Sequence, residues 1–394
     1  MLIDYTPEQK QMKSELRAYL GALVTDEVRA EYSGGAEGGG PLYTQVLRRL
    51  GADGWLGIGW PKEFGGRDRP PIEQYIFFDE VQRAGFPIPF LTLNTVGPTL
   101  MKFGTDEQKA RFLPAILRGE LHFAIGYSEP EAGTDLAALR TKAVKADDGS
   151  GDYIVTGQKI FTSQAEYADF IWLAVRTDPE AQKHQGISIL MVDTQAPGFS
   201  LTPIHTLGGT RTNATYYDQV RVPEAARIGR EGEGWKLITT QLNHERVALS
   251  APGSTARLYE ETLAWARETR VAGTRVIDQP WVQRNLARAA AKLEVLRLMG
   301  WRQAWNLGRG ALDMAESSTI KVYSSESFVE IYQLLLEVLG PEGALREGSA
   351  GALIRGRIEM FYRTTLVFTF GGGVNEIQRD IIAMAGLRMP RAPR

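Results

Sequence analysis

A carboxylate in the segment LNHER (242–246) could act as a general base. Leu242, Glu245 and Leu249 are spaced i, i+3 and i+7, so we expect Glu245 to project from an apolar helix face. A charge on such a face is either paired or functional, because burial without a partner is costly. The alternative to a catalytic role is a structural ion pair of Glu245 with Arg246 or with a neighbouring helix.

A loop of small and hydroxyl-bearing residues, YSEPEAGTD (127–135), could bind a flat ligand. It follows an apolar strand and contains the hydroxyl of Ser128, a Glu-Pro turn and the pair Gly133 and Thr134. Backbone donors of such a loop can approach a ligand closely. The alternative is a tight loop that only joins two strands.

A second candidate segment, GQKIFTS (157–163), places an aromatic ring and two hydroxyls at the end of a predicted strand. These residues are Phe161, Thr162 and Ser163. Phe161 could form the wall of a cofactor site, and its alternative role is core packing.

The elements that would position these residues fall into three zones, distinguished by the period of their apolar residues. Helical spacing up to about residue 120, as at Met12, Leu16 and Leu20, gives way to β-rich runs between turn residues. Helical spacing then returns in the long segments 281–305 and 312–338. The β-rich runs are 153–163, 169–177, 186–194 and 215–223. We therefore predict an N-terminal α-helical domain (1–120), a middle antiparallel β domain (121–230) and a C-terminal helix bundle (231–394).

Composition excludes several classes of function. The 394 residues are 43% hydrophobic and 23% charged, with a formal net charge of -2 and no cysteine. A chain without cysteine has no disulfide, no thiolate metal site and no cysteine nucleophile. Its four histidines lack metal-ligand spacing, so we expect no metal. Without a basic field or a polybasic patch, neither nucleic acid nor a membrane surface is an expected partner.

The N-terminus begins with a helix signal instead of a secretory segment. Thr6 is the predicted cap, Pro7 the first helical residue and Gln9 the third. No run of residues approaches the roughly 20 apolar residues of a membrane span. We therefore expect a cytoplasmic protein.

Six ordered segments resemble the acyl-CoA dehydrogenase family over nearly the whole chain. They are PKEFGG (61–66), GTDEQKARFLPAILRGE (104–120), YSEPEAGTD (127–135), GQKIFTS (157–163), GWKLITTQLNHER (234–246) and NEIQRDIIA (375–383). The resemblance implies an α+β multidomain fold of N-terminal helices, a middle β domain and a C-terminal four-helix bundle. It also implies FAD between the β domain and the bundle, and α,β-dehydrogenation of an acyl-CoA thioester.

The resemblance assigns cofactor contacts to both loops. Tyr127, Ser128, Gly133 and Thr134 would line the flavin and the pantetheine arm. Phe161 would stand against the isoalloxazine in place of the family's usual tryptophan, with Thr162 beside it and Ser163 bonded near the hydride-accepting nitrogen. Such a site needs an apolar wall, a few fixed donors and little room for water.

The position of the base departs from the commonest pattern of the family. Many members carry it on the loop that matches 371–374, which here reads Gly-Gly-Gly-Val. A smaller group, including members acting on branched and long acyl chains, carries a glutamate just before an arginine on an early helix of the bundle, which Glu245 and Arg246 match. Arg246 is assigned to the substrate site, where we expect it to steady the active-site loop. Gly372 and Gly373 would remove bulk beside the acyl pocket, although the glycines could simply form a turn.

A second departure predicts a partner subunit. In homotetrameric members a neighbouring subunit also holds FAD, through an Arg-x-Phe-Gly segment with a downstream Gln and through a Gln-x-x-Gly-Gly segment. Here the two regions read RVAGTRVIDQPWVQ (270–283) and EVLGPEG (337–343), so donors for the adenine and pyrophosphate end are missing. We expect a paralogous chain to supply them in a two-plus-two heterotetramer, with a homotetramer as the alternative.

The substrate prediction follows from the same resemblance. Paired subunits of this kind resemble those with which actinobacteria shorten steroid side chains, and this chain is most similar to the base-bearing member. An electron-transfer flavoprotein or a similar acceptor would reoxidise the flavin. The alternatives are a dehydrogenase for branched or long-chain acyl-CoA, a flavin oxidase or monooxygenase of the same fold, and a non-catalytic subunit.

Overall fold

The computed structural model describes residues 4–32, 38–249, 251–311 and 313–390, without the side chains of residues 242–249. Helix α1 (Pro7–Leu23) begins where the sequence predicts, with Pro7 as its first residue. Thr6 Oγ1 accepts from the Gln9 backbone N–H at 3.3 Å, and Gln9 Oε1 accepts from the Thr6 N–H at 3.0 Å. This reciprocal cap satisfies two backbone donors that a helix start otherwise leaves unpaired.

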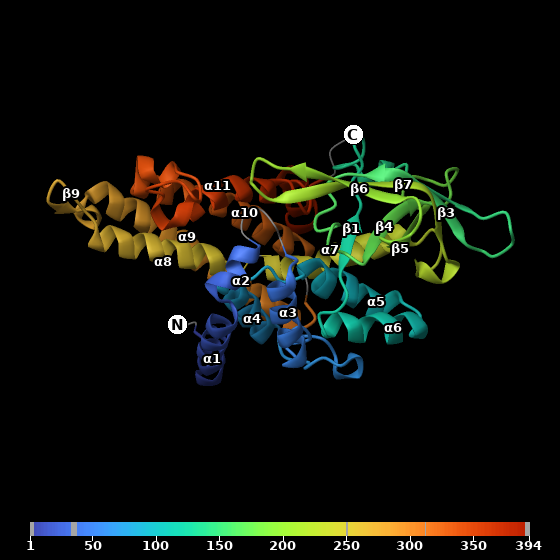
Figure 1. The fold of residues 1–394 in the computed structure, drawn as a ribbon, viewed down its shortest axis with the longest axis horizontal. Helices are drawn as coiled ribbons and strands as arrows, with labels where there is room; N and C mark the ends of the chain where they lie inside the picture. The colour runs from blue at the N-terminus through green and yellow to red at the C-terminus, as the bar shows by residue number, and fades with distance from the viewer. Residues whose placement is uncertain (1–3, 33–37, 250, 312, 391–394) are drawn as a thin grey trace.

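Helices form the first part of the chain and pack against one face of the sheet (Figure 1). After α1 come α2 (Asp26–Glu31), α3 (Pro41–Ala52), α4 (Pro71–Ala84), a π-helical turn η2 (Thr92–Val96), α5 (Gly97–Phe103) and α6 (Asp106–Leu117). Their shared core includes Leu20, Leu47 and Phe77, each with at most 1% of its surface exposed. That core continues into the sheet through Trp172 and Ile189.

One twisted sheet forms the middle of the chain, in the order β6-β7-β3-β2-β4-β5-β8, with β1 paired to β4. The strands are β1 (Phe123–Gly126), β2 (Lys142–Lys145), β3 (Tyr153–Lys159), β4 (Phe170–Arg176), β5 (Ile187–Asp193), β6 (Phe199–His205), β7 (Arg211–Val222) and β8 (Arg227–Ile228). Along β4, Trp172 faces the helical core while Ile171 and Leu173 face a second core shared with β3 and β7. Both faces of β4 are therefore buried, which explains its uninterrupted apolar sequence.

The sheet differs from the expectation at three points. Most pairs are antiparallel, as predicted, but β1 and β2 each pair in parallel with β4. Strands β2, β6 and β8 lie outside the four predicted runs, because β2 and β8 are short and β6 contains Pro203, has many exposed residues and lies at the sheet edge. The run at 153–163 leaves the strand after Lys159, since Phe161 adopts a positive φ of 60°.

Long helices complete the chain and extend away from the sheet (Figure 1). The predicted segment 281–305 lies within α9 (Pro280–Gly308). The predicted segment 312–338 corresponds to α10 (Met314–Leu339), which begins after its N-cap Asp313, and residue 312 lies outside the described residues. With α7 (Gly234–Leu249) and α8 (Gly253–Glu268) they form the C-terminal bundle, followed by α11 (Arg357–Thr365) and α12 (Asn375–Ile381). A short ribbon of β9 (Arg270–Val271) and β10 (Thr274–Arg275) joins α8 to α9 at the end farthest from the sheet.

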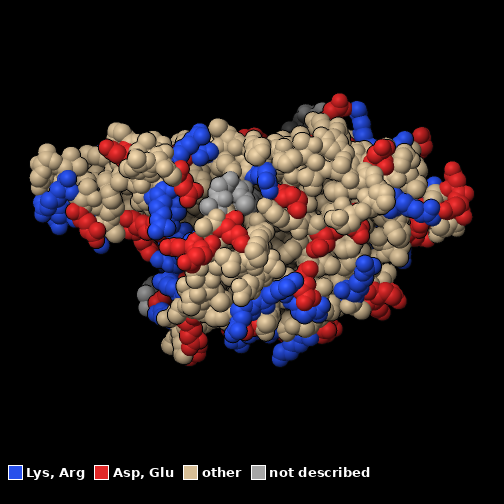
Figure 2. Space-filling model, in the orientation of Figure 1, with Lys and Arg blue, Asp and Glu red and all other residues tan. Residues whose placement is uncertain are grey.

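Helix α7 is shared by all three regions. It contacts β5 of the sheet, η2, α4 and α5 of the N-terminal helices, and α9 and α10 of the bundle. On the face in Figure 2, acidic and basic side chains alternate over the N-terminal helices instead of forming one basic stripe. Within the described ranges, none of the helices is long and apolar enough to cross a membrane.

Candidate active site

A buried ion pair joins the two loops that the sequence singles out. Lys159 Nζ, at the end of β3, donates to Glu129 Oε1 at 2.8 Å and to the Tyr127 carbonyl at 3.1 Å. The carboxylate of Glu129 also accepts the backbone N–H groups of Arg140 at 2.6 Å and Thr141 at 2.9 Å. A satisfied buried network of this kind fixes the relative position of the segments that it joins.

The charge state of this pair follows from opposing effects. Burial alone would raise the pKa of Glu129, but Lys159 and Thr141 together hold it below the usual range. Burial lowers the pKa of Lys159 to about 8, although Glu129 opposes the change. With the pKa of Glu129 lowered and that of Lys159 still about 8, we expect both side chains to be charged at pH 7, in agreement with their 2.8 Å contact.

Phe161 is exposed and held in a strained backbone conformation. Its side chain belongs to the exposed large apolar residues, with 61% of its surface accessible. Its φ is 60° and that of Gln164 is 62°. The left-handed region costs a residue with a Cβ about 1 to 2 kcal/mol, and such strain gathers at ligand sites. The core-packing alternative for Phe161 is therefore wrong.

Thr162 and Ser163 have different environments. Thr162 is fully buried, its N–H donates to the Asn213 carbonyl at 2.9 Å, and its hydroxyl lies 3.4 Å from that of Thr215. The hydroxyl of Ser163 is half-buried, 3.4 Å from that of Thr212. Thr162 is therefore buried beyond the end of β3, where it is hydrogen-bonded to β7, while Ser163 is partly exposed.

The first loop presents its backbone to open space. Gly133 and Thr134 are exposed, and Ser128 is half-buried, with its carbonyl accepting the Ile160 N–H at 2.9 Å. A Cβ added at Gly133 would meet no atom within 4 Å, and φ is not positive there. Because the chain itself does not require glycine at this position, the free space fits the close approach of a ligand.

Tyr127 connects this loop to helix α7. Its hydroxyl donates to Gln241 Oε1 and accepts the indole N–H of Trp172 at 3.2 Å. Helix α7 also carries Glu245 and Arg246, whose backbone is helical and whose side chains lie outside the described residues. Their predicted roles therefore rest on their place in α7, one turn beyond Gln241 in the case of Glu245.

The glycine loop near the C-terminus is held by a lysine. Gly372 and Gly373 have φ values of 67° and 98°, which only glycine adopts without strain. Lys321 Nζ of α10 donates to the Gly373 carbonyl at 2.5 Å and to Asn375 Oδ1 at 2.7 Å. A Cβ at Gly372 would meet nothing within 4 Å, so this loop is open on one side.

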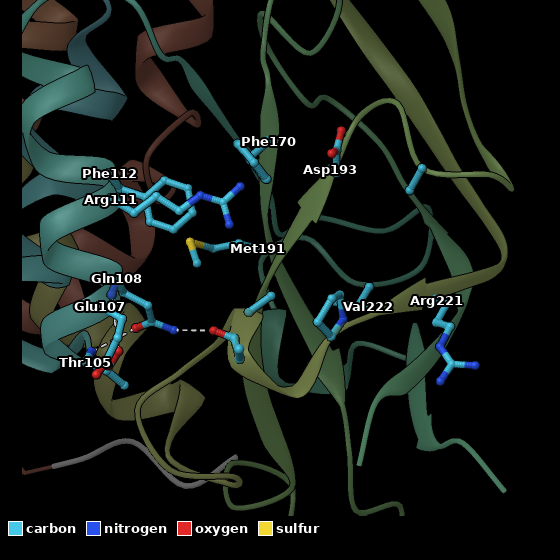
Figure 3. Close-up of a pocket in the computed structure, with 14 residues that line it drawn as sticks. Thr105, Glu107, Gln108, Arg111, Phe112, Phe170, Met191, Asp193, Arg221 and Val222 are labelled. Carbon is cyan, nitrogen blue, oxygen red and sulfur yellow. Dashed lines mark hydrogen bonds between the residues drawn. The ribbon is translucent and has the colours of Figure 1, made fainter. Parts of the chain in front are cut away.

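A cavity of about 500 Å³ lies elsewhere, between α6 and the edge formed by β4 and β5 (Figure 3). Its walls include Phe112, Phe170 and Met191, and the guanidinium carbon of Arg111 lies 4.9 Å from the Phe112 ring centroid. None of the predicted site residues whose side chains the structure describes lines it. Within the described part of the chain no group of acidic or histidine side chains could hold a metal ion.

Sequence reasoning missed the residues that support the site, namely Glu129, Lys159, Trp172, Gln241 and Lys321. One signal was present for Lys159, since it falls in alternation with the buried residues Tyr153 and Val155 along β3. A lysine at an inward position of a strand requires a buried anion, and this could have directed attention to the acidic residues of the preceding loop.

The family is defined by matches along the entire chain. The models of the acyl-CoA dehydrogenase N-terminal, middle and C-terminal domains match residues 6–120, 124–220 and 232–387. The chain belongs to the acyl-CoA dehydrogenase family, whose members are FAD-dependent oxidoreductases. The order of helices, sheet and bundle that the resemblance implied is thereby confirmed.

Particular relatives are similar over their full length. Acyl-CoA dehydrogenases FadE26 and FadE29 of Mycobacterium tuberculosis are 54% and 49% identical to this chain, each over 100% of both sequences. Among solved structures, the ChsE4-ChsE5 complex from Mycobacterium tuberculosis has a TM-score of 0.93 at 53% identity, covering 100% of both chains. The Tcur3481-Tcur3483 steroid ACAD has a TM-score of 0.93 at 51% identity, again covering 100% of both chains.

Proposed function

We propose that this chain dehydrogenates a bulky acyl-CoA thioester, of the steroid side-chain class, at its α,β bond, working in the cytoplasm with FAD. Glu245 takes the α-proton, and the β-hydrogen leaves with its electron pair, so that the products are an enoyl-CoA and reduced flavin. An electron-transfer flavoprotein or a similar acceptor removes the two electrons.

The observation that carries this proposal is the location of Glu245 on α7. The α-proton beside a thioester is only weakly acidic, so its removal needs a carboxylate in a site that excludes water. The loop at 371–374 contains no carboxylate, whereas α7 contacts the sheet, the N-terminal helices and the bundle together. The contacts of α7 support this proposal, because a helix shared by the three regions is a suitable carrier for a base in a site that excludes water.

The residues of the two loops fit an aromatic cofactor. Phe161 offers an exposed ring at a fixed backbone position, and Gly133 leaves room for a ligand to approach the backbone. We assign Tyr127, Ser128, Gly133, Thr134, Phe161 and Ser163 to the FAD site, with Thr162 as their support. When bound, FAD supplies the acceptor for the β-hydrogen, and the chain's own residues orient the thioester and exclude water.

A paralogous subunit is part of the proposal. The segment 270–283 includes the β9–β10 ribbon, which lies at the end of the bundle away from the sheet and from the loops that we assign to FAD (Figure 1). Apolar side chains are exposed along 367–389, at Val367, Phe368, Phe370, Met384, Leu387 and Met389. Exposed apolar groups of this number are usual where another chain packs. Two similar structures are described as pairs of different chains, which favours a two-plus-two heterotetramer over a homotetramer.

The steroid class rests on similarity and on the glycine loop. One of the similar structures is described as a steroid ACAD. Gly372 and Gly373 add no side chain beside the loop, and a Cβ at Gly372 would point into open space. A pocket bordered by this loop can accept a ring system where a side chain would obstruct it. Arg246, next to Glu245, is proposed to steady this loop.

The test is an anaerobic titration of the purified chain, alone and co-expressed with its paralogue, in which flavin absorbance is followed as thioester is added. Bleaching by a steroid side-chain CoA thioester in the mixed complex, lost in Glu245→Gln, is the expected result. Bleaching of the lone chain by a straight-chain acyl-CoA would contradict both the partner and the steroid class. Unchanged bleaching in Glu245→Gln would contradict the assignment of the base.

A further inference from the structure

Three side chains from three elements form a hydrogen-bonded chain that ends on α7. Trp172 of β4 is fully buried and donates its indole N–H to the hydroxyl of Tyr127, which donates to Gln241. An indole N–H can only donate, so the phenol oxygen accepts from it and directs its own proton to Gln241 Oε1. This order fixes the orientation of the Gln241 carboxamide, with Nε2 directed away from Tyr127.

The amide nitrogen of Gln241 lacks an acceptor. Gln241 is only 1% exposed, and its Nε2 has no hydrogen-bond partner among the residues that the structure describes. Thr95, on the π-helical turn that packs against α7, is 2% exposed and its hydroxyl is likewise unpaired within the described ranges. Buried donors without acceptors are rare in folded proteins, and each requires an explanation.

The location of Gln241 points to a ligand as the missing acceptor. The residue lies one helical turn before Glu245 on α7, and its partner Tyr127 belongs to the loop assigned to FAD. Within the proposed reaction, both the thioester and the flavin offer carbonyl oxygens, which accept N–H donors. A ligand carbonyl beside α7 would satisfy the donor that the chain leaves unpaired.

We infer that Gln241 is a ligand-binding residue whose Nε2 donates to a carbonyl oxygen of the bound acyl-CoA or FAD, with Trp172 and Tyr127 as its positioning residues. This inference rests on the proposed function. It assigns a second role to α7. Besides carrying the base, the helix would bind either the thioester, whose α-proton the base removes, or the flavin, which accepts the hydride.

Two substitutions distinguish the acceptor function of the Gln241 Oε1 from the donor function of its Nε2. Gln241→Glu keeps an oxygen that can accept from Tyr127 and removes the N–H donors, whereas Gln241→Met removes both functions at similar length. Gln303→Leu is the matched control, since Gln303 is 2% exposed on α9 and also has one unpaired amide atom, Oε1, among the described residues. The complex with its paralogous partner is used throughout.

Five quantities are measured for each variant: the flavin absorbance spectrum without substrate, FAD retention during gel filtration, kcat and KM for the acyl-CoA, and Tm. If the acceptor belongs to FAD, Gln241→Glu shifts the spectrum and weakens FAD retention before substrate is added. If it belongs to the thioester, the free spectrum is unchanged and kcat/KM falls by about 10- to 100-fold, as for a lost hydrogen bond to a bound ligand.

Gln303→Leu is expected to lower Tm alone. The inference is overturned if both Gln241 variants keep the wild-type spectrum, FAD retention and kcat/KM and differ only in Tm. The wild-type complex separates this inference from the proposed function. If the flavin of the wild type is not bleached by any acyl-CoA, the proposed function is contradicted. If the wild type is active and the Gln241 variants differ from it only in Tm, only the role of Gln241 is contradicted.

Discussion

Lys159 and Glu129 form an ion pair of 2.8 Å in which the two side chains are 0% and 8% exposed. They lie 30 residues apart in the chain, on β3 and on the loop that follows β1. The pair keeps the segment of Phe161 and the segment of Ser128 at one distance from each other. The ion pair thus links the two loops of the proposed FAD site directly to each other.

Removing one partner of this pair should be more damaging than removing both. Glu129→Gln leaves a buried ammonium group without its anion, which costs about 3 to 5 kcal/mol of stability. Lys159→Met with Glu129→Gln replaces both charges, and its loss should be smaller than the sum of the single losses. Denaturant unfolding of the wild type, Glu129→Gln, Lys159→Met and the double variant gives the coupling free energy between the two side chains. Glu131→Gln, which breaks the exposed pair with Arg140, should change stability by less than about 1 kcal/mol. Additive single losses would contradict the pair.

Acid should weaken the same contact. The pKa of Glu129 in the folded chain lies below its usual value of 4.5, so below that pH the unfolded chain binds more protons. The stability contributed by Glu129 is complete above about pH 4.5 and is lost as the pH falls through the folded pKa. The unfolding free energy of the wild type minus that of the Lys159→Met, Glu129→Gln double variant should therefore fall as the pH is lowered from 6 to 3. If the wild type instead gains stability relative to the double variant as the pH falls, the lowered pKa of Glu129 is refuted.

Replacing Phe161 should separate stability from cofactor retention. Phe161→Gly relieves the positive φ and should raise the stability of the FAD-free protein by about 1 kcal/mol. The same change removes the exposed ring, so FAD should be lost more readily during gel filtration. Phe161→Ala removes the ring and keeps the strain, and should therefore lose FAD without a gain in Tm. If FAD retention is unchanged in both variants, Phe161 is not part of the flavin wall.

A methyl group on the glycine loop should discriminate between substrates. Gly372→Ala meets no atom within 4 Å but has a φ of 67°, so it should cost about 1 kcal/mol through the backbone alone. Next to the proposed pocket it should also raise KM for a steroid thioester more than for a straight-chain one. Gly348→Ala is the control, with a φ of 80° and no atom within 4 Å on an exposed loop. Equal KM ratios for the two variants would remove Gly372 from the substrate site.

The sequence was sufficient for elements set by local patterns. The cap at Thr6 and the long helices α9 and α10 follow from neighbouring residues, and these predictions are confirmed. Six short motifs identified the family and hence the order of the regions. The assignments of individual site residues, Glu245 and Arg246 included, stay predictions that the proposed variants test.

Features that depend on distant contacts or on rare conformations could not be predicted. The bond between Tyr127 and Gln241 joins residues 114 apart, and Lys321 reaches a loop 52 residues away. No local pattern specifies such pairs, because they depend on how the sheet and the helices pack. The positive φ of Phe161 was equally hidden, since aromatic residues seldom adopt it and the run 153–163 has strand propensity.

The shared position of α7 determines how the molecule comes apart. A helix that contacts the sheet, the N-terminal helices and the bundle at once cannot lose its packing in one region without exposing apolar surface in the other two. Unfolding that begins at any of the three regions therefore spreads through α7 to the others. Calorimetry should then show one cooperative transition, and a protease should find few partly opened forms to cut, although the chain is built from three successive regions.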